Sequence, residues 1–370
     1  MSTVAITGRP WSSAARSCRS AVAGPVVKSL PGKAAVPDDH PFTTGCIGVL
    51  GTRPSEEALE GADTLLLVGT SFPWAANVPD PARVRAVQIE TDPARFGGSG
   101  ANEVTLLGDA AETLSALLPL LARKADRGFL EQAQAGMAAW RRRLDELEDQ
   151  TRDPIQPQYL MRVVDRCAAP DAILASDSGT VATWSARHFD VRGDRHYLLS
   201  ANLATIAAGV PYAIAAQWAH PGRGCIAVTG SDGFAKVMGE LLTAIQYRLP
   251  VKVVISNVSS LGRRLRTGQN GTPGTPADFA TWAAANGALG LRVEHATEVE
   301  PAVRRAFSTP GPALVERADH VGVAAGAVEV VDVAEGADRV EAVRLVDLLL
   351  AALAGLSPWG PEHSGLIHAI

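Results

Sequence analysis

The 370-residue sequence contains little cysteine, has no run of more than three basic residues and carries only a small excess of negative charge. Its four cysteines, Cys18, Cys46, Cys167 and Cys225, are far apart and form no C-x-x-C pair. This spacing argues against a zinc site and a disulfide framework, and it favours a reducing, cytoplasmic compartment. The net charge of −5 argues against nucleic acid as the main partner.

Long apolar runs are also missing. No stretch reaches the roughly 18 residues that a membrane span needs, and the nearest candidate, residues 345–356, is interrupted by Asp347. With 46% hydrophobic and 20% charged residues, the composition is that of an ordinary globular protein. We therefore expect no membrane span and no extensive disorder.

The first part of the chain alternates short apolar runs with amphipathic stretches, as a parallel α/β sheet does. We predict strands at residues 4–7, 25–29, 64–68, 84–90 and 103–107, and helices at residues 14–22, 55–60, 110–121 and 128–150. Pro154 and Pro157 then mark a linker. The first domain is expected to span residues 1–152.

The pattern repeats in a second predicted domain, residues 158–325. Strands are expected at residues 172–175, 224–229, 251–255, 291–293 and 313–316, with helices at 159–166, 180–188, 207–220, 234–247, 276–286 and 298–307. Trp184 and Trp218 lie in apolar helices and are expected in the core. The predicted fold is therefore two doubly wound, mostly parallel α/β domains, followed by a helical tail over residues 326–370.

One segment of the second domain carries the clearest chemical signal. The sequence Thr-Gly-Ser-Asp-Gly-Phe at 229–234 follows a predicted strand and opens a helix, and the next strand ends in a polar turn that includes Asn257 and Ser259. Backbone N–H groups at a helix start can bind an anion. A basic loop beyond this turn carries Arg263, Arg264 and Arg266, which would suit an anionic ligand or a solvated surface.

These residues resemble the motif of the thiamine diphosphate enzymes, in the branch of the pyruvate oxidases and acetolactate synthases. In that family a Gly-Asp-Gly sequence and a later Asn-Asn pair hold Mg²⁺, which grips the cofactor diphosphate. Mg²⁺ prefers oxygen ligands and shares them with phosphate. The resemblance implies a small-molecule substrate, a 2-keto acid or a derivative of one.

The motif can be aligned in two ways. Anchoring on Gly230 and Phe234 places Ser231 where the family has aspartate and Val258 where it has the second asparagine. The rival register shifts by one residue and keeps Asp232 and Asn257 as metal ligands. Because such a shift turns a strand residue to the opposite face, we favour the first register and leave the second open.

The resemblance extends over most of the second domain. Asp177 and Gly179 match the family's Asp-x-Gly turn. Thr205 and Ile206 lie in a segment that resembles Gly-x-Met-Gly, where a large apolar residue supports the bent cofactor. Ala204 and Ala207 replace the glycines of that segment and bring methyl groups close to the cofactor. The predicted cofactor-binding residues here are therefore Asp177, Gly179, Thr205, Ile206, Gly230, Ser231, Asp232, Gly233, Asn257 and Ser259.

The first domain resembles the family's middle domain, in which two turns line an FAD site. The matching residues are Thr70, Phe72 and Pro73 in one turn and Glu90 and Asp92 in the other. Both turns follow adjacent predicted strands, where open α/β sheets bind ligands. FAD is therefore a second candidate cofactor, although the same turns can serve packing alone.

The family also has an N-terminal domain whose glutamate activates the cofactor, and we expect this chain to lack it. Three hypotheses follow. The chain works with a partner chain or as a self-associated oligomer on a 2-keto acid, or it is a repurposed enzyme that uses the old cleft for another substrate or a flavin. The third is a non-catalytic pseudoenzyme that steadies a relative, for which helix 345–356 could be a docking element.

Overall fold

The computed structural model describes residues 2–6, 23–48, 50–70, 79–80, 82–97, 102–122, 124–152, 154–200, 203–256 and 277–318. The chain divides into two compact units. Unit 1 consists of residues 1–146 and 190–194, and unit 2 of residues 147–189 and 195–370. No helix in the described part of the chain combines the length and the apolar character that a membrane span requires.

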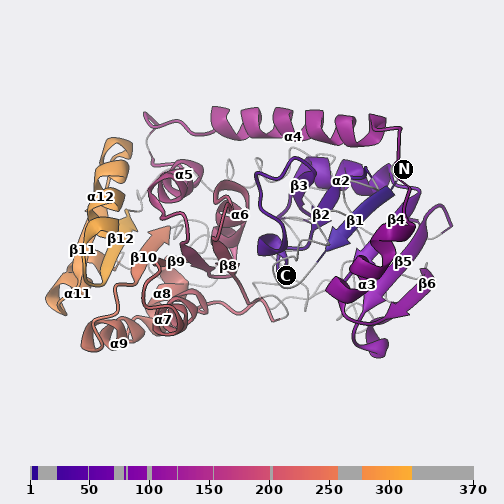
Figure 1. The fold of residues 1–370 in the computed structure, drawn as a ribbon. Helices are drawn as coiled ribbons and strands as arrows, with labels where there is room; N and C mark the ends of the chain where they lie inside the picture. The colour runs from indigo at the N-terminus through magenta and orange to yellow at the C-terminus, as the bar shows by residue number, and fades with distance from the viewer. Residues whose placement is uncertain are drawn as a thin grey trace, which may run out of the picture. The chain divides into compact units, whose positions relative to one another are not determined.

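Unit 1 is built on a six-stranded parallel sheet (Figure 1). Its strands are β1 (Ser2–Ile6), β2 (Val26–Lys28), β3 (Thr43–Cys46), β4 (Thr64–Val68), β5 (Arg85–Glu90) and β6 (Asn102–Leu107). The spatial order is β3-β2-β1-β4-β5-β6, so the winding direction reverses between β1 and β4. Ligands bind outside the carboxyl ends of the strands at such a switch point.

Helices cover both faces of this sheet. They are α2 (Arg53–Glu60), α3 (Ala110–Leu117) and α4 (Gly128–Glu146), with short 3₁₀ turns η1 (Lys33–Ala35), η3 (Pro93–Arg95) and η4 (Leu118–Leu120). Thr52 and Asp109 accept hydrogen bonds from the first-turn N–H groups of α2 and α3, which explains where these helices begin. Leu59 of α2 and Leu114 of α3 lie in the cores on opposite faces.

Unit 2 contains a second six-stranded parallel sheet. Its strands are β7 (Ile173–Ser176), β8 (His196–Leu198), β9 (Cys225–Thr229), β10 (Lys252–Ser256), β11 (Leu289–Val293) and β12 (Ala313–Arg317). The order β11-β12-β10-β9-β7-β8 means that the chain winds outward from β7 to β8 and then returns across β7 to β9. The switch point of this sheet therefore lies between β7 and β9.

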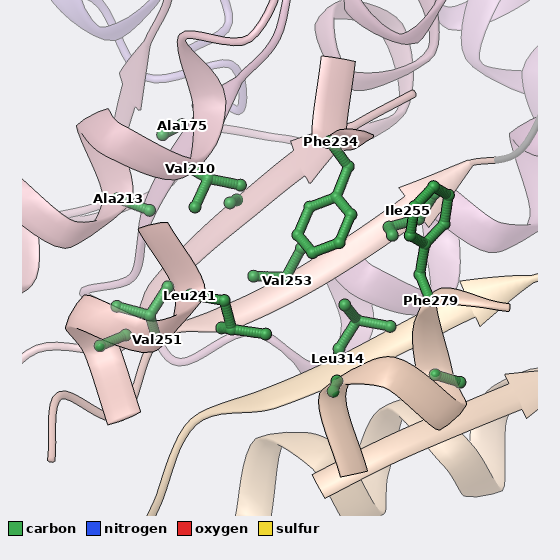
Figure 2. Packing of buried hydrophobic residues seen from close by; sticks show 14 residues of the cluster. Ala175, Val210, Ala213, Phe234, Leu241, Val251, Val253, Ile255, Phe279 and Leu314 are labelled. Carbon is green, nitrogen blue, oxygen red and sulfur yellow. The ribbon is translucent and has the colours of Figure 1, made fainter. Parts of the chain in front are cut away.

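The helices of unit 2 lie in two layers (Figure 1). One layer holds α5 (Pro157–Cys167), α6 (Thr180–His188) and α12 (Ala296–Ser308); the other holds α7 (Gly209–Ala219), α8 (Ser231–Val237), α9 (Glu240–Gln246) and α11 (Phe279–Ala285). Figure 2 shows the core under the second layer, where Phe234 and Phe279 meet edge to face at 5.1 Å. This packing fixes α8 against the sheet.

The predicted fold class is confirmed, since both units are doubly wound parallel α/β structures. The edge strands β3 and β8 were not predicted, because both are short and β3 is polar. The single helix predicted at 234–247 is wrong: the chain breaks into α8 and α9 at Met238 and Gly239. The predicted helices 14–22 and 345–356 lie outside the described residues.

The two tryptophans that were both expected in the core have different environments. Trp184 of α6 is buried, as predicted. Trp218 of α7 is 63% exposed, so its prediction is wrong. An apolar helix sequence shows that a tryptophan can be buried, but it does not show whether a neighbouring element is there to cover it.

Candidate functional site

The switch point of the second sheet brings together most of the predicted cofactor residues that the structure describes. Asp177 and Gly179 follow β7, while Gly230 and Ser231 follow β9, its neighbour in the sheet. Helix α6 leaves this edge on one side of the sheet and α7 and α8 on the other. The carboxyl edge between β7 and β9 is therefore the candidate site.

Asp177 holds the segments of this edge in place. Its Oδ1 accepts hydrogen bonds from the N–H groups of Ser178 (3.1 Å) and Ala208 (3.0 Å), and its Oδ2 accepts one from the hydroxyl of Thr229 (2.9 Å). The side chain is almost fully buried. It thus ties the end of β7 to the start of α7 and to the end of β9, and its carboxylate is occupied by protein donors.

Two glycines allow this close approach. A Cβ added to Gly233 would lie 2.0 Å from Asp177 Oδ2 and 2.8 Å from Thr229 Oγ1. A Cβ on Gly209 would lie 3.1 Å from the Asp177 nitrogen and 3.2 Å from the Val228 oxygen. Gly233 packs against the Asp177 carboxylate, and its predicted contact with a cofactor stays a prediction.

Two other glycines have no described residue close to them. An added Cβ on Gly179 or Gly230 would meet no atom of the described residues within 4 Å. Gly179 also has a φ of +95°, a conformation that L side chains rarely adopt. These two residues precede α6 and α8, and no described side chain caps the N-terminus of either helix. The first-turn N–H groups therefore lack side-chain acceptors beside an open backbone cradle.

The loop before α7 completes the edge. Thr205 is exposed and Ile206 is 44% exposed, so the apolar side chain that the resemblance places beneath a cofactor is available. Ala204 and Ala207 have φ values of 48° and 78°. Left-handed backbone of this kind suits glycine and strains alanine. The loop keeps a glycine-like path although both glycines are replaced.

The metal ligands are less complete. Ser231 is the first residue of α8 and is half-buried, and Asp232 is exposed in the same turn. Asn257 and Ser259 lie outside the described residues, as do Val258 and the three loop arginines. Among the residues that the structure describes, no group of three or more His, Cys, Asp or Glu side chains is arranged to hold a metal ion.

The corresponding edge of unit 1 contains the predicted flavin residues. Thr70 follows β4 at the switch point and is buried. Glu90, at the end of β5, is also buried; its Oε1 accepts a hydrogen bond from the Thr91 N–H, while its Oε2 has no partner among the described residues. Asp92 is exposed and caps η3 through the Ala94 N–H. Phe72 and Pro73 lie outside the described residues.

The sequence reasoning overlooked Gln88 and Thr229. Gln88 is buried in β5 and donates to the carbonyl groups of Thr70 and Arg95, which joins the two predicted flavin turns. Thr229 immediately precedes Gly230 and supplies the hydroxyl that binds Asp177. Its position at a strand end was a usable signal, whereas the role of Gln88 depends on contacts that no local pattern shows.

A buried charge cluster in unit 1 was also missed. Asp38 binds the ammonium groups of Lys28 (2.6 Å) and Lys33 (2.7 Å), and its Oδ2 accepts the N–H of Val191 (2.8 Å). Lys28 also donates to the carbonyl groups of Lys33 and Val36. Burial acts to raise the pKa of Asp38, but the two ammonium groups outweigh it and hold that pKa at about 2. Burial likewise opposes the charged form of Lys33, yet Asp38 raises the pKa of Lys33 above its ordinary value.

Comparison with known protein families agrees with this division into two domains. Residues 11–117 match the central domain of the thiamine pyrophosphate enzymes. Residues 177–317 match their C-terminal TPP binding domain, a range that begins at Asp177 and ends at the last residue of β12.

Individual relatives agree with these matches. The chain is 38% identical over 300 residues to the Bacillus subtilis (strain 168) protein YdaP, named as a thiamine pyrophosphate-containing protein, covering 80% of this chain and 52% of that protein. It is 32% identical over 235 residues to pyruvate oxidase of Lactiplantibacillus plantarum, covering 63% and 39%. It is 31% identical over 314 residues to the acetolactate synthase large subunit of Porphyra purpurea, covering 79% and 52%. The chain therefore spans about half the length of the curated relatives it matches.

Proposed function

The chain belongs to the thiamine pyrophosphate enzyme family, and from this premise we propose that it holds thiamine diphosphate at the switch point of unit 2. The observation that carries the proposal is the open backbone cradle at Gly179 and Gly230. Each residue follows one of two neighbouring strands, β7 and β9, and precedes a helix that no described side chain caps. Such a cradle supplies N–H donors to a diphosphate and leaves room for it.

The other residues of the edge have separate roles in this proposal. Ile206 provides an exposed apolar surface for the cofactor rings. Asp177 has a positioning role in this proposal, because its carboxylate already holds the surrounding segments through three hydrogen bonds. Thiamine diphosphate, when bound, supplies the electron sink that decarboxylation or ligation of a 2-keto acid requires.

The described residues fit Mg²⁺ less well than they fit the diphosphate. Asp232 is the carboxylate nearest to the Gly230 turn in sequence and is exposed, so it is the candidate side-chain ligand for Mg²⁺. Ser231 would be a weaker ligand in the first alignment. We therefore expect the diphosphate to depend on backbone donors more than on Mg²⁺.

The relatives and the composition support proposals for the substrate, the assembly and the compartment. Pyruvate oxidase and acetolactate synthase are among the similar proteins, which favours a 2-keto acid as substrate. The active form is proposed to include a partner chain or a second copy. The three cysteines in the described part of the chain are free, which favours a reducing cytoplasm.

Calorimetric titration tests the cradle directly. We expect thiamine diphosphate to bind and thiamine without phosphate to bind far more weakly. Gly230→Ala places a methyl group in the cradle and should weaken thiamine diphosphate at least about 10-fold. Gly239→Ala is the matched control, because its added Cβ also meets open space but lies beyond α8. Equal affinities for thiamine and its diphosphate would contradict the proposal.

A second titration, with EDTA in place of MgCl₂, measures the contribution of the metal. A small change supports backbone recognition, and complete loss of binding would assign the diphosphate to a metal site. If thiamine diphosphate binds neither with MgCl₂ nor with EDTA, the proposal fails. The remaining candidates are then a repurposed enzyme and a non-catalytic scaffold.

Unit 1 supports FAD as a second cofactor. The unpartnered Oε2 of Glu90 lies at the carboxyl edge of the sheet, where a ribose hydroxyl or an amine could donate to it. Purified protein that carries flavin should be yellow, and Glu90→Gln should lower the flavin content while the fold is kept. Colourless protein that does not bind added FAD would remove this candidate.

A further inference from the structure

Three buried hydroxyl groups of unit 2 form a connected row that leads to the candidate site. Ser176 ends β7, Ser185 lies in α6 and Tyr197 lies in β8. The Ser185 Oγ is 2.8 Å from the Ser176 Oγ and 2.9 Å from the Tyr197 hydroxyl oxygen. Both serines are fully buried and Tyr197 is 5% exposed. Because water has little access to these hydroxyls, they bind one another. We call Ser176, Ser185 and Tyr197 the hydroxyl row.

The strand register brings these side chains to one face of the sheet. Tyr197 pairs with Leu174 where β8 runs parallel to β7. Ser176 lies two residues after Leu174, and side chains at positions i and i+2 of a strand point to the same face. Helix α6 packs against β7 and β9, so Ser185 reaches both hydroxyls. Each member of the hydroxyl row therefore comes from a different element, and one comes from the edge strand β8.

Counting the protons gives the hydroxyl row a direction. Ser176 Oγ donates to the Asp177 carbonyl at 2.9 Å, since a carbonyl oxygen only accepts. Its single proton is then used, so Ser176 accepts from Ser185. The other acceptor near Ser185 Oγ, the Ala182 carbonyl, is 3.2 Å away, longer than O–H···O hydrogen bonds normally are. Tyr197 therefore donates to Ser185, and the row runs from the phenol to the Asp177 carbonyl.

The hydroxyl row ends on the peptide group that begins the turn before α6. The Asp177 carbonyl accepts from Ser176, and the N–H of the same peptide group, on Ser178, donates to Asp177 Oδ1 at 3.1 Å. The Asp177 N–H donates to the Val228 carbonyl in β9 at 2.8 Å. The next residue in the turn is Gly179. A peptide group bound at both its carbonyl and its N–H cannot turn without breaking a hydrogen bond, which holds the direction of the N–H groups that follow it.

We propose that the hydroxyl row is a positioning element for the diphosphate cradle, and that the Tyr197 hydroxyl raises cofactor affinity through it. This inference rests on the proposed function, because the cradle is the proposed diphosphate site. Donors that are held in their binding directions beforehand bind more tightly, since less ordering is needed on binding. In a row of hydrogen bonds each donor polarises the next, so loss of the first weakens the last. Removal of the phenol oxygen should therefore loosen the turn that carries Gly179.

Calorimetric titration with thiamine diphosphate tests this coupling. Tyr197→Phe keeps the ring and removes one neutral hydrogen bond, so we expect about a 5-fold loss of affinity. Ser176→Ala should give a similar loss. If the hydroxyl row acts as a unit, the double variant also loses about 5-fold; a loss of roughly 25-fold would mean independent hydroxyls and would contradict the proposal. Tyr159→Phe is the matched control, because Tyr159 is equally buried, in α5, and lies outside the row; it should leave the affinity unchanged.

Hydrogen exchange of the protein without ligand tests the hydroxyl row independently of the cofactor. Tyr197→Phe should speed amide exchange in residues 178–183 by about 5-fold and leave α12 unchanged. Unchanged exchange in residues 178–183 would overturn the proposal, and so would faster exchange there without a loss of affinity. If the wild type binds no thiamine diphosphate, the proposed function fails, and the exchange result alone decides whether the hydroxyl row positions the turn.

Discussion

Each unit contains a buried aspartate near the carboxyl edge of its sheet, and the two carboxylates are stabilised in different ways. Asp38 in unit 1 lies between two ammonium groups, those of Lys28 and Lys33. Asp177 in unit 2 is bound by two backbone N–H groups and one hydroxyl, all of them uncharged. Both aspartates join segments that are distant in sequence, since Asp38 reaches Val191 and Asp177 reaches Ala208 and Thr229.

The difference shows what each edge can do. In the Asp38 cluster one carboxylate is paired with two ammonium groups, and Asp190 also attracts the Lys33 ammonium. Asp177 borders the open cradle and has no cationic partner among its hydrogen-bond donors, so its rigidity depends on geometry rather than on ion pairing. Carboxylates of similar burial therefore have different surroundings, two ammonium groups in unit 1 and uncharged donors beside the proposed cofactor site in unit 2.

The largest expected effect comes from removing the charge of Asp38. Asp38→Asn leaves two buried ammonium groups without their carboxylate and should destabilise the protein by about 3–5 kcal/mol. Urea unfolding followed by circular dichroism measures the change. Asp39→Asn is the control, because Asp39 is exposed next to it and should shift the midpoint little. A small effect of Asp38→Asn would mean that the lysines find other acceptors.

The second-largest effect is expected from overpacking the space beside Asp177. Gly233→Ala places a Cβ 2.0 Å from the Asp177 Oδ2, so the carboxylate or α8 must move. We expect a loss of about 3 kcal/mol. The control Gly239→Ala adds the same methyl group in open space and should be neutral or slightly stabilising. Thermal unfolding of the pair compares them, and equal midpoints would show that the Asp177 environment is not rigid.

Lowering the pH should reduce the free energy of unfolding of unit 1, because Asp38 becomes protonated. Its pKa is about 2 in the folded protein against an ordinary 3.8, so the unfolded chain takes up the proton first. This contribution is complete above pH 3.8 and is lost as the pH falls through 2, amounting to about 2 kcal/mol. The measurement is the unfolding free energy of the wild type and of Asp38→Asn as a function of pH. Parallel curves between pH 4 and pH 2 would contradict the expected shift.

The same amide substitution should be mild at Asp177. In Asp177→Asn the new amide can face Thr229, whose hydroxyl can then donate to the Gly230 carbonyl at 3.1 Å. The side-chain oxygen still accepts the N–H groups of Ser178 and Ala208, so we expect a loss of about 1 kcal/mol. Asp177→Ala removes both acceptors and should cost more. If Asp177→Asn were as damaging as Asp38→Asn, the distinction between the two aspartates would fail.

The smallest effect is a gain in stability. Ala207 precedes the N–H that Asp177 binds and holds a φ of 78°. Ala207→Gly removes that strain and should stabilise the protein by about 0.5–1 kcal/mol after the added freedom of the unfolded chain is counted. Ala235→Gly, in α8, should instead destabilise by about 1 kcal/mol. A loss of stability in Ala207→Gly would show that the alanine methyl group makes a useful contact.

Much of the fold followed from local patterns. Short apolar runs such as β4 and β9 are unmistakable, and caps such as Asp109 fix helix starts. The predictions failed where contacts with elements distant in sequence decide whether a segment forms a strand or a side chain is buried. The short strands β3 and β8 form only because a neighbouring strand is there to pair with them. Trp218 is exposed because no described element packs over that side of α7.

The candidate site also combines features that the sequence predicts with features that only the tertiary structure shows. By itself the sequence determined the family, the doubly wound class and the strand ends that carry Asp177, Gly179 and Gly230, because these depend on residue type and spacing along the chain. Only the tertiary structure decided that Gly179 and Gly230 have no described neighbour on their Cβ side, whereas Gly233 packs against Asp177. All three are glycines in turns or at helix starts, and the difference arises from the strand order that sets β7 beside β9. Contacts between residues about 50 positions apart leave no periodic signal in a sequence.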